Sequence, residues 1–401
     1  MSGLQQNFVL FDDLQRDHLL PFTFTRPVAE IRLGILTIRE KWEKWTGNRF
    51  SYFTQDYLQA KYPLVTGDEN IIINGSVTPN SALVSEILEL NCGELLMKDN
   101  LLIAGCIDRL SMEAFAMQVP EGCTVKPVRS DFLRISRLWQ IFGLNGEELC
   151  SDFKLMTSGR ESLPVSPANN LISPENIFVE EGANLQCVTI NAGTGPVYIG
   201  RNAKIMEGSL IRGPLALCEG STIKMGARIY GPTTIGPFSK VGGEITNSVF
   251  MSFSKKVHDG YMGNSVVGEW CNIGAGSNTS NLKNNYTLVK VWNYALGREE
   301  DTGLQFCGLF MGDYSRCGIN TMFNTGTVVG VSANIYGSGY PGSFIPSFSW
   351  GGAAGFETYR LGKALETIQT VLSLNELEIA ETDRQIINRV FALTGRYRKL
   401  V

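Results

Sequence analysis

Residues 254–263, which read SKKVHDGYMG, gather side chains suited to acid–base chemistry and to binding. His258 is one of only two histidines among 401 residues. Imidazole changes charge near neutral pH, so it is well suited to accept a proton there. Tyr261 can supply a hydroxyl, and Lys255 and Lys256 can attract phosphates. The alternatives are a solvent-facing histidine, a packing tyrosine and two solvated lysines.

The elements that position this stretch follow a six-residue repeat. Residues 199–246 read as eight consecutive hexads, and the period returns at 311–340. The eight hexads begin with Ile199, Ile205, Ile211, Leu217, Ile223, Ile229, Ile235 and Val241. This period fits neither a helix nor a simple strand. It predicts a solenoid whose aliphatic residues point inward. Residues 247–266 and 279–306 interrupt the period, and loops that leave a rigid solenoid often carry function.

Composition limits the classes of protein to consider. Hydrophobic residues make up 43% and charged residues 18%, and the net charge of −4 disfavours a nucleic-acid partner. The nine cysteines show no CxxC pair, which predicts reduced thiols. Those expected to be buried are Cys187, Cys218, Cys271, Cys307 and Cys317. No signal peptide or long apolar span is visible, which predicts a soluble, cytoplasmic protein with no membrane partner.

The chain divides by pattern into four parts. Strands at 7–11, 71–73 and 101–104 and helices at 35–45 and 81–90 predict an α/β domain over 1–157. Residues 158–174 are rich in Pro, Ser and Asn and predict a linker. The solenoid is expected over 175–350. Two helices, near 359–370 and 378–393, are expected within 351–401 to cap the last coil.

The hexads resemble those of the hexapeptide-repeat, left-handed β-helix acyltransferases. The resemblance implies a left-handed parallel β-helix, and it implies a homotrimer with sites between neighbouring coils. The left hand rests on the resemblance alone, because general rules for parallel crossovers favour the right hand.

Residues 254–276 (SKKVHDGYMGNSVVGEWCNIGAG) carry a closer resemblance. They look like the acetyltransferase centre of the bifunctional uridyltransferase/acetyltransferase that makes UDP-N-acetylglucosamine. That family has Ser-Lys-x-x-His-x-x-Tyr-x-Gly followed by Gly-x-x-x-Asn-Ile-Gly-Ala-Gly. The resemblance implies that His258 is a general base, that Tyr261 binds the sugar and that Asn272 positions the acceptor. It places acetyl-coenzyme A contacts at Ala275 and Asn281.

The implied chemistry suits these residue types. An amine or hydroxyl that attacks a thioester must lose a proton, which a neutral imidazole can take. The tetrahedral oxyanion then needs a donor, for which we expect a backbone N–H at Gly274, Ala275 or Gly276. The family's Arg-x-Arg-Pro-Gly segment is missing after residue 238, and its Asn-Tyr pair is Asn281-Leu282 here. The acceptor therefore stays open.

Residues 8–45 resemble the start of a sugar-1-phosphate nucleotidyltransferase domain, with Pro21-Phe22-Thr23 and then Arg26-Pro27 before a helix. Two features depart from that family. Residues 11–18 (FDDLQRDH) stand where its glycine-rich phosphate loop would be, and Gly75-Ser76 replaces its Gly-Asp metal site.

The basic and acidic residues of this region still allow a ligand. Arg16, Arg26 and Arg32 are candidates to hold a phosphate or nucleotide, and Asp12 and Asp13 are candidates for Mg²⁺. The alternative is that the arginines pair with surface carboxylates and the aspartates form a turn.

These patterns together predict an acyltransferase that uses acetyl-coenzyme A or another acyl-coenzyme A. The acceptor would be an amino-sugar phosphate or a nucleotide sugar, as in UDP-N-acetylglucosamine biosynthesis. The N-terminal domain would be a reduced nucleotidyltransferase. Two alternatives stay open: an active glucose-1-phosphate thymidylyl- or uridylyltransferase with a structural solenoid, and a non-catalytic sugar-nucleotide sensor or scaffold.

Overall fold

The computed structural model describes residues 6–113, 115 and 122–399. The chain forms two compact units. The first comprises residues up to Leu19, then Thr25–Ile31 and Leu36–Ser136, and the second comprises Leu20–Phe24, Arg32–Ile35 and Arg137–Val401. Among the described residues, no helix is long and apolar enough to span a lipid bilayer.

The first unit is built on a mixed six-stranded sheet of order β4-β1-β5-β7-β6-β8. Its strands are β1 (Asn7–Phe11), β4 (Phe50–Phe53), β5 (Glu69–Asn74), β6 (Glu94–Lys98), β7 (Leu101–Asp108) and β8 (Thr124–Pro127). Strand β1 runs parallel to both β4 and β5, whereas β7 is antiparallel to β5 and β6. The predicted α/β domain is confirmed in class, and the three predicted strands are β1, β5 and β7.

Helices α1 (Ile38–Thr46), α2 (Ser81–Leu88) and α3 (Arg109–Glu113) complete the first unit, with short 3₁₀ turns at Leu14–Leu19, Val28–Glu30 and Asp56–Leu58. Helix α1 begins with a capping box. The Thr37 side chain accepts a hydrogen bond from the Glu40 N–H, and the Glu40 carboxylate accepts one from the Thr37 N–H. Gly47 ends the helix in the left-handed conformation, at a φ of 72°.

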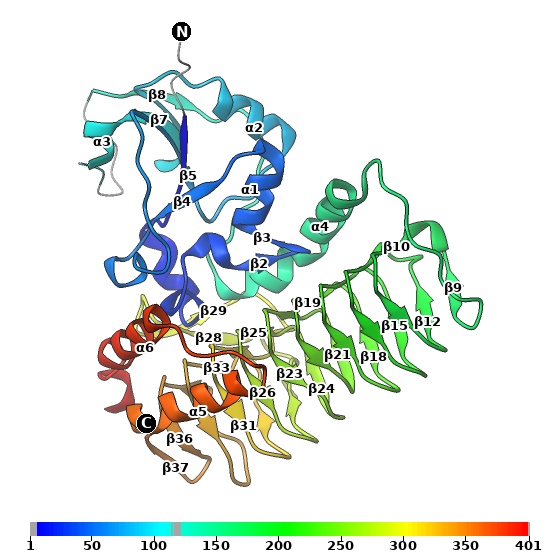
Figure 1. Ribbon diagram of the computed structural model, residues 1–401. Helices are drawn as coiled ribbons and strands as arrows, with labels where there is room; N and C mark the ends of the chain where they lie inside the picture. The colour runs from blue at the N-terminus through cyan, green and yellow to red at the C-terminus, as the bar shows by residue number, and fades with distance from the viewer. Residues whose placement is uncertain (1–5, 114, 116–121, 400–401) are drawn as a thin grey trace. The chain divides into compact units, whose positions relative to one another are not determined.

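The second unit is a parallel β-solenoid with three faces (Figure 1). Face one contains β10 (Ile177–Val179), β13 (Val197–Ile199), β16 (Leu215–Leu217), β19 (Thr233–Ile235), β22 (Val249–Phe250), β25 (Val266–Val267), β30 (Phe310–Met311), β33 (Val328–Val329) and β35 (Phe344–Ile345). Face two contains β11 (Asn184–Leu185), β14 (Lys204–Ile205), β17 (Thr222–Ile223), β20 (Lys240–Val241), β23 (Lys255–Lys256), β26 (Asn272–Ile273), β31 (Arg316–Cys317), β34 (Asn334–Ile335) and β36 (Ser349–Gly352). Face three contains β9 (Asn170–Ile172), β12 (Thr189–Asn191), β15 (Leu210–Arg212), β18 (Arg228–Tyr230), β21 (Glu244–Thr246) and β24 (Tyr261–Gly263), with the separate pair β27 (Asn278–Thr279) and β32 (Met322–Phe323).

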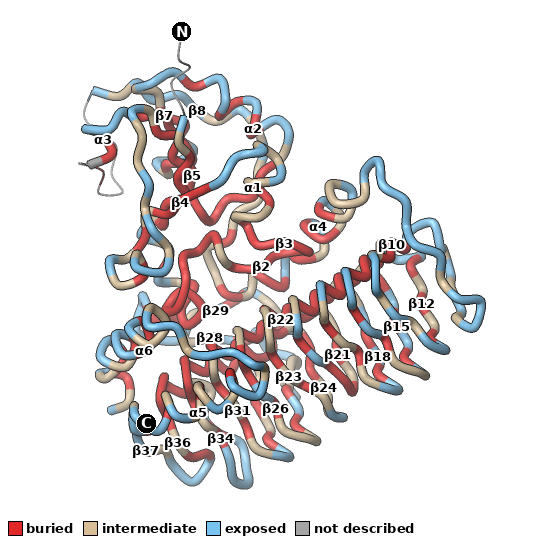
Figure 2. Tube along the Cα trace, viewed as in Figure 1, coloured by how far each residue is buried: buried red, intermediate tan, exposed pale blue. Residues whose placement is uncertain are grey.

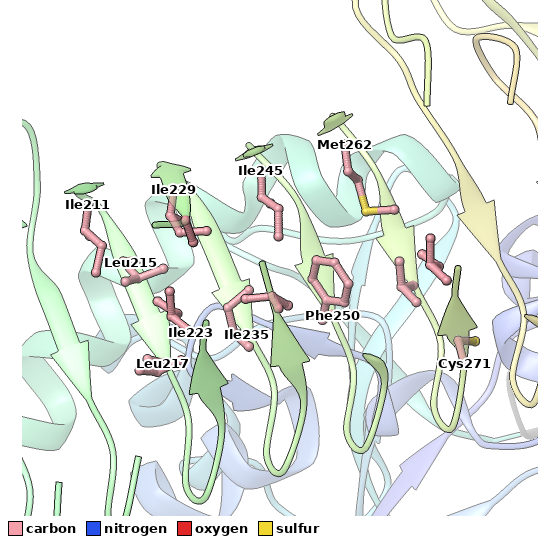
Figure 3. Packing of buried hydrophobic residues seen from close by; sticks show 14 of the residues in the cluster. Ile211, Leu215, Leu217, Ile223, Ile229, Ile235, Ile245, Phe250, Met262 and Cys271 are labelled. Atoms are coloured by element: carbon pink, nitrogen blue, oxygen red, sulfur yellow. The ribbon is translucent and has the colours of Figure 1, made fainter. Parts of the chain in front are cut away.

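The predicted hexad register is confirmed. All eight aliphatic residues that begin the hexads are at most 3% exposed, and they stack on their counterparts in adjacent coils (Figures 2 and 3). Ile223, for example, lies opposite Ile205 on one side and Val241 on the other. Small residues such as Ala203, Ser209 and Ser221 are fully buried. The core of this unit is therefore the interior of the coil itself.

The expected break over 247–266 is wrong, because the coil continues through it as β22, β23 and β24. The inward positions here are held by Phe250, Lys256 and Met262. The inward position changes by fewer than six residues in three places: by four from Val241 to Ile245, and by five from Ile245 to Phe250 and from Met262 to Val267. These shorter steps and the inward lysine hide the period in the sequence.

Helix α4 (Leu138–Thr157) belongs to the second unit and packs on face one at β19, β22 and β25. It also holds a segment from near the chain start. The Gly34 N–H donates to Asn145 Oδ1 and the Ile35 N–H donates to Asp152 Oδ2, both at 2.8 Å. The boundary between the two compact units therefore lies between Ser136 and Arg137, whereas the sequence predicted it at residue 157.

The excursion over 279–306 contains an antiparallel hairpin, β28 (Lys290–Asn293) and β29 (Arg298–Asp301). After β36 the chain turns back as β37 (Gly355–Thr358), which pairs antiparallel with β36. The edge of face two is thus covered by a strand, where the sequence predicted helices. Helices α5 (Leu361–Ser373) and α6 (Glu381–Leu393) follow, close to their predicted positions.

Candidate functional site

Asp12 and Asp13, the candidates for Mg²⁺, have their oxygens satisfied by protein donors. Asp12 accepts from the Val28 N–H at 2.8 Å and from Thr54 Oγ1 at 2.6 Å, and it pairs with Arg16 Nε at 3.3 Å. Burial raises the pKa of the Asp12 carboxyl, although Arg16 and the two hydrogen bonds oppose this rise. Asp12 is therefore a structural residue.

The carboxylate oxygens of Asp13 are also satisfied by protein donors. Its Oδ1 accepts from the Gln15 N–H at 2.8 Å, and its Oδ2 accepts from Asn74 Nδ2 at 2.9 Å and from Arg134 Nη2 at 2.8 Å. No group of three or more His, Cys, Asp or Glu residues among those described is placed to hold a metal ion. Because Mg²⁺ requires free oxygen ligands, the residues present do not fit it.

Two of the three candidate arginines, Arg16 and Arg26, belong to the first unit, and Arg32 belongs to the second. Arg16 is 5% exposed, and its guanidinium also contacts Asp17 at 2.9 Å and the Tyr57 hydroxyl at 3.1 Å. Arg26 is 4% exposed in the same unit. Arg32 belongs to the second unit, where its guanidinium donates to the Ile35 carbonyl. Contacts of these arginines with a phosphate or nucleotide therefore stay a prediction.

His258 lies on an exposed corner of the solenoid, between β23 and β24. Two glycine corners flank it in the adjacent coils. An added Cβ at Gly243 would lie 3.0 Å from the His258 carbonyl oxygen, and the Gly276 N–H donates to the Asp259 carbonyl at 3.0 Å. Within the described part of the chain the imidazole makes no hydrogen bond. The small neighbours leave space for a substrate beside it.

Lys256 was predicted to face a substrate. The structure corrects this prediction, because the Lys256 side chain points into the coil and is 1% exposed. Its Nζ donates to the Gly242 carbonyl at 3.0 Å and to the His258 carbonyl at 2.8 Å. It takes an inward place opposite Val241 in the next coil. The ammonium therefore fixes the backbone at the His258 corner and does not face a substrate.

Burial lowers the pKa of Lys256 to about 8, from an ordinary value of 10.5. Between these two values the unfolded chain binds more protons than the folded chain, so raising the pH favours the folded state. We expect the free energy of unfolding of the wild type to rise by about 3 kcal/mol from pH 8 to pH 10.5, relative to Lys256→Met. Urea unfolding at both pH values measures this. A difference between the two proteins that stays constant with pH would contradict it.

Of the three backbone N–H groups expected as oxyanion donors, two are already bonded to protein acceptors. The Gly274 N–H donates to the Cys317 carbonyl at 3.1 Å, and the Gly276 N–H is bonded to Asp259. The Ala275 N–H has no acceptor within the described residues. Ala275 lies in the corner that stacks on the His258 corner, so its N–H is a backbone donor without an acceptor in the adjacent coil.

Tyr261 and Asn281, predicted from separate parts of the sequence, meet on face three. The Tyr261 hydroxyl hydrogen-bonds to Asn281 and Thr246, and burial raises its pKa against the effect of these bonds. Asn281 Nδ2 donates to Asn264 Oδ1 at 2.8 Å. Gly263 makes this arrangement possible, because a Cβ there would lie 2.3 Å from the Tyr261 oxygen and 2.6 Å from Asn281 Nδ2. Gly263 stands in the Tyr-x-Gly pattern, but its role depends on the contact between Tyr261 and Asn281, which sequence spacing does not show.

We expect Gly263→Ala to displace both side chains while the coil stays folded. A displacement of about 1 Å of a positioning group can reduce turnover by about 10²-fold. Gly143→Ala is the matched control, since a Cβ there meets nothing within 4 Å. Thermal unfolding and turnover would be compared for the two variants. Wild-type turnover in Gly263→Ala would show that the Tyr261–Asn281 pair does not position a substrate.

Lys255 and Asn272 point outward on consecutive rungs of face two, in a row with Lys240 and Arg316. None of the three cations forms an ion pair within the described part of the chain. Burial, and then Lys240, lower the pKa of Lys255. Like charges on opposite positions of a sheet destabilise it, so the row favours an anionic ligand.

Arg228 is a candidate that the sequence analysis missed. It stands on face three in one column with Glu244 and Tyr261, and its Nε lies 3.1 Å from the Glu244 carboxylate. Only the register of the coils places it two rungs from Tyr261, because the two residues are 33 positions apart in sequence. It adds a cation to the Tyr261 face.

A cavity of about 450 Å³ lies beside Asn281 at the start of the excursion. Its lining is mostly uncharged and polar, which suits hydroxyl and amide groups of a ligand. The lining residues are Ser280, Leu282, Lys283, Asn284, Asn285, Asn324, Thr325 and Tyr340. His258 is not among the lining residues.

The cysteines offer no nucleophile at this site. Burial raises the pKa of Cys271, Cys307 and Cys317, which keeps these thiols protonated. All nine cysteines are free, and the predicted burial holds for Cys218, Cys271, Cys307 and Cys317. It is wrong for Cys187, which is exposed.

The N-terminal part of the chain matches a family model described as sugar nucleotidyl transferase, over residues 8–161. The bifunctional sugar-1-phosphate nucleotidylyltransferase/acetyltransferase of Sulfurisphaera tokodaii is 32% identical over 227 residues, which are 49% of this chain and 56% of that protein. The bifunctional protein GlmU of Methanocaldococcus jannaschii is 33% identical over 118 residues, which are 29% of this chain and 26% of that protein. The match thus spans about half the length of the first relative and about a quarter of the second.

Among solved structures, the UDP-N-acetylglucosamine acyltransferase from Campylobacter jejuni shares 15% identity with this chain at a TM-score of 0.26, covering 57% of this chain and 96% of that one. The relatives by sequence combine the same two kinds of domain in one chain by name. This chain is accordingly a distant homologue of the bifunctional nucleotidyltransferase/acetyltransferase proteins, with a sugar nucleotidyltransferase-type domain followed by a hexapeptide-repeat β-helix of the acyltransferase type.

Proposed function

We propose that the solenoid transfers an acyl group, in the simplest case acetyl, from an acyl-coenzyme A to an amino-sugar phosphate or a nucleotide sugar. The observation that carries the proposal is the His258 corner. An exposed imidazole stands there between two glycine corners, and the free N–H of Ala275 lies in the next coil. A proton acceptor and an oxyanion donor are the two groups that acyl transfer to an amine requires.

In the proposed reaction, the acceptor nitrogen attacks the thioester carbonyl and gives its proton to the His258 imidazole. The Ala275 N–H donates to the oxyanion that develops on the carbonyl oxygen. The carbon–sulfur bond then breaks, and the coenzyme thiolate takes the proton from the His258 imidazolium as the amide product forms, which restores the neutral imidazole. Lys256 keeps the His258 backbone in place, through its hydrogen bond to the His258 carbonyl.

Three features support a phosphorylated sugar as the acceptor. The cavity beside Asn281, whose lining is mostly uncharged and polar, suits hydroxyl and amide groups. Tyr261 and Asn281 supply hydrogen-bonding groups on the same face. Arg228 and the cation row with Lys255 suit phosphate.

A panel of ligands tests the proposal. Thermal shifts would be measured with acyl-coenzymes A, nucleotides and sugar phosphates, and thiol release would be followed with acetyl-coenzyme A, glucosamine-1-phosphate and other amino sugars. We expect stabilisation by an acyl-coenzyme A and acceptor-dependent thiol release. If no acyl-coenzyme A binds and no acceptor reacts, the sensor or scaffold alternative is the better one.

We further propose that the protein acts as a homotrimer in which a neighbouring chain completes the site. The imidazole has no partner within the described part of its own chain, which leaves a place for a group from a neighbouring chain. Light scattering should give a mass about three times the 44.2 kDa of one chain. A monomer at micromolar concentration would contradict the shared site.

A further inference from the structure

Strands β1 and β5 of the first unit are adjacent and parallel, with Phe11 opposite Asn74. Their carboxyl ends therefore meet at one edge of the sheet, where open α/β sheets bind ligands. Asp13 follows β1 and Ser76 follows β5 at this edge. A divalent cation at this place would draw on carboxylate oxygens from both strand ends.

Arg134 occupies this strand-end site. Its Nη2 donates to Asp13 Oδ2 at 2.8 Å and its Nε donates to Ser76 Oγ at 2.9 Å. Asn74 closes the network, since its Nδ2 donates to Asp13 Oδ2 at 2.9 Å and its Oδ1 accepts from Ser76 Oγ at 2.6 Å. Each polar group that faces the site is therefore bonded to another member of the network.

The backbone fixes Arg134 in this position. The Thr78 N–H donates to the Leu133 carbonyl and the Ile135 N–H donates to the Ser76 carbonyl, both at 3.0 Å. Arg134 itself bridges to Val77 in antiparallel fashion. The Arg134 side chain is 20% exposed and that of Asp13 is 12% exposed, so solvent screens their charges only in part. The guanidinium is thus an ordered part of the sheet edge.

We infer that Arg134 is the resident cation of the strand-end site, so that the domain takes no divalent metal. The guanidinium neutralises Asp13, the carboxylate that a metal would need, and it repels a second cation. The amide of Asn74 and the hydroxyl of Ser76 offer only neutral oxygens, and both of these already accept hydrogen bonds. This inference concerns the first unit alone, so it does not depend on acyl transfer by the solenoid.

The inference has a chemical consequence. Nucleotidyl transfer from a nucleoside triphosphate to a sugar phosphate releases pyrophosphate, and metal ions usually neutralise the charge that develops on the phosphates. A domain with a fixed guanidinium at this site supplies one cation to a carboxylate and none to the phosphates. We therefore expect the full chain to release little pyrophosphate from UTP or dTTP with hexose-1-phosphates and Mg²⁺.

Mn²⁺ binding tests the inference without relying on activity. Electron paramagnetic resonance of the full chain should show no stoichiometric loss of the free Mn²⁺ signal. The double variant Ser76→Asp with Arg134→Ala places a second carboxylate near Asp13 and removes the guanidinium, and it should take up Mn²⁺ stoichiometrically. Arg129→Ala is the matched control, because Arg129 is an exposed arginine of the same segment that pairs with Glu86.

Two results would overturn the inference. One is stoichiometric Mn²⁺ binding by the wild type that is lost in Asp13→Asn. The other is a double variant that is folded by circular dichroism and takes up no Mn²⁺, because the guanidinium would then not be standing in the place of a cation. Rapid, Mg²⁺-dependent pyrophosphate release that is lost in Asp13→Asn would overturn the inference in the same way as Mn²⁺ binding by the wild type.

Discussion

His258→Ala is expected to lower kcat for acyl transfer by about 10²–10⁴-fold, the usual contribution of a general base. The reason is that no other imidazole can take the proton, since the only other histidine, His18, lies in the first unit. The KM values should change little, because the loss concerns the transition state. Thiol release from acetyl-coenzyme A with a reactive acceptor measures both constants.

The variant should keep its fold. The His258 side chain is exposed and makes no hydrogen bond within the described residues, and its carbonyl, which accepts from Lys256, remains in alanine. Thermal unfolding of His258→Ala should therefore match the wild type, and His18→Gln serves as a histidine control in the other unit. Wild-type turnover in His258→Ala, with a confirmed acceptor, would remove His258 from the mechanism.

Ile223→Asp is expected to prevent folding of the solenoid. Ile223 is fully buried between Ile205 and Val241 of the adjacent coils, and an unpaired carboxylate there has no hydrogen-bonding partner. The milder Ile223→Ala should lower the free energy of unfolding by about 2–5 kcal/mol through the cavity that it leaves. Denaturant unfolding monitored by circular dichroism measures both changes.

Thr222→Asp is the matched control for this position. Thr222 is the neighbour of Ile223 on the same strand, but it points outward between Lys204 and Lys240. A carboxylate there would be solvated and would lie between two cations, so we expect an unchanged or slightly higher stability. A well-folded Ile223→Asp protein would mean that the inward register is assigned to the wrong residues.

The sequence was sufficient to predict the solenoid register, because the inward position depends on local spacing. Each hexad places one aliphatic residue in the interior of its own coil. The burial of Ile199 and Ile235 can therefore be predicted from the local spacing, without knowledge of distant residues. The same locality explains the strands β1, β5 and β7 and the helices α1, α5 and α6. The nucleotidyltransferase and acyltransferase resemblances depend on short motifs of the same local kind.

Only the tertiary structure determined the neighbours of polar residues. The sequence predicted Lys256 to be a surface lysine beside His258. In the structure its side chain points inward, and two backbone carbonyls accept hydrogen bonds from its ammonium group. The sequence predicted Asp13 to be a metal ligand. In the structure the guanidinium of Arg134, which follows 121 residues later, neutralises the Asp13 carboxylate. Arg228 and Tyr261 come into one column only because three successive coils stack. Burial of an apolar side chain follows from the local repeat, whereas a charge or hydrogen bond is satisfied by whichever group the fold brings within about 3 Å of it.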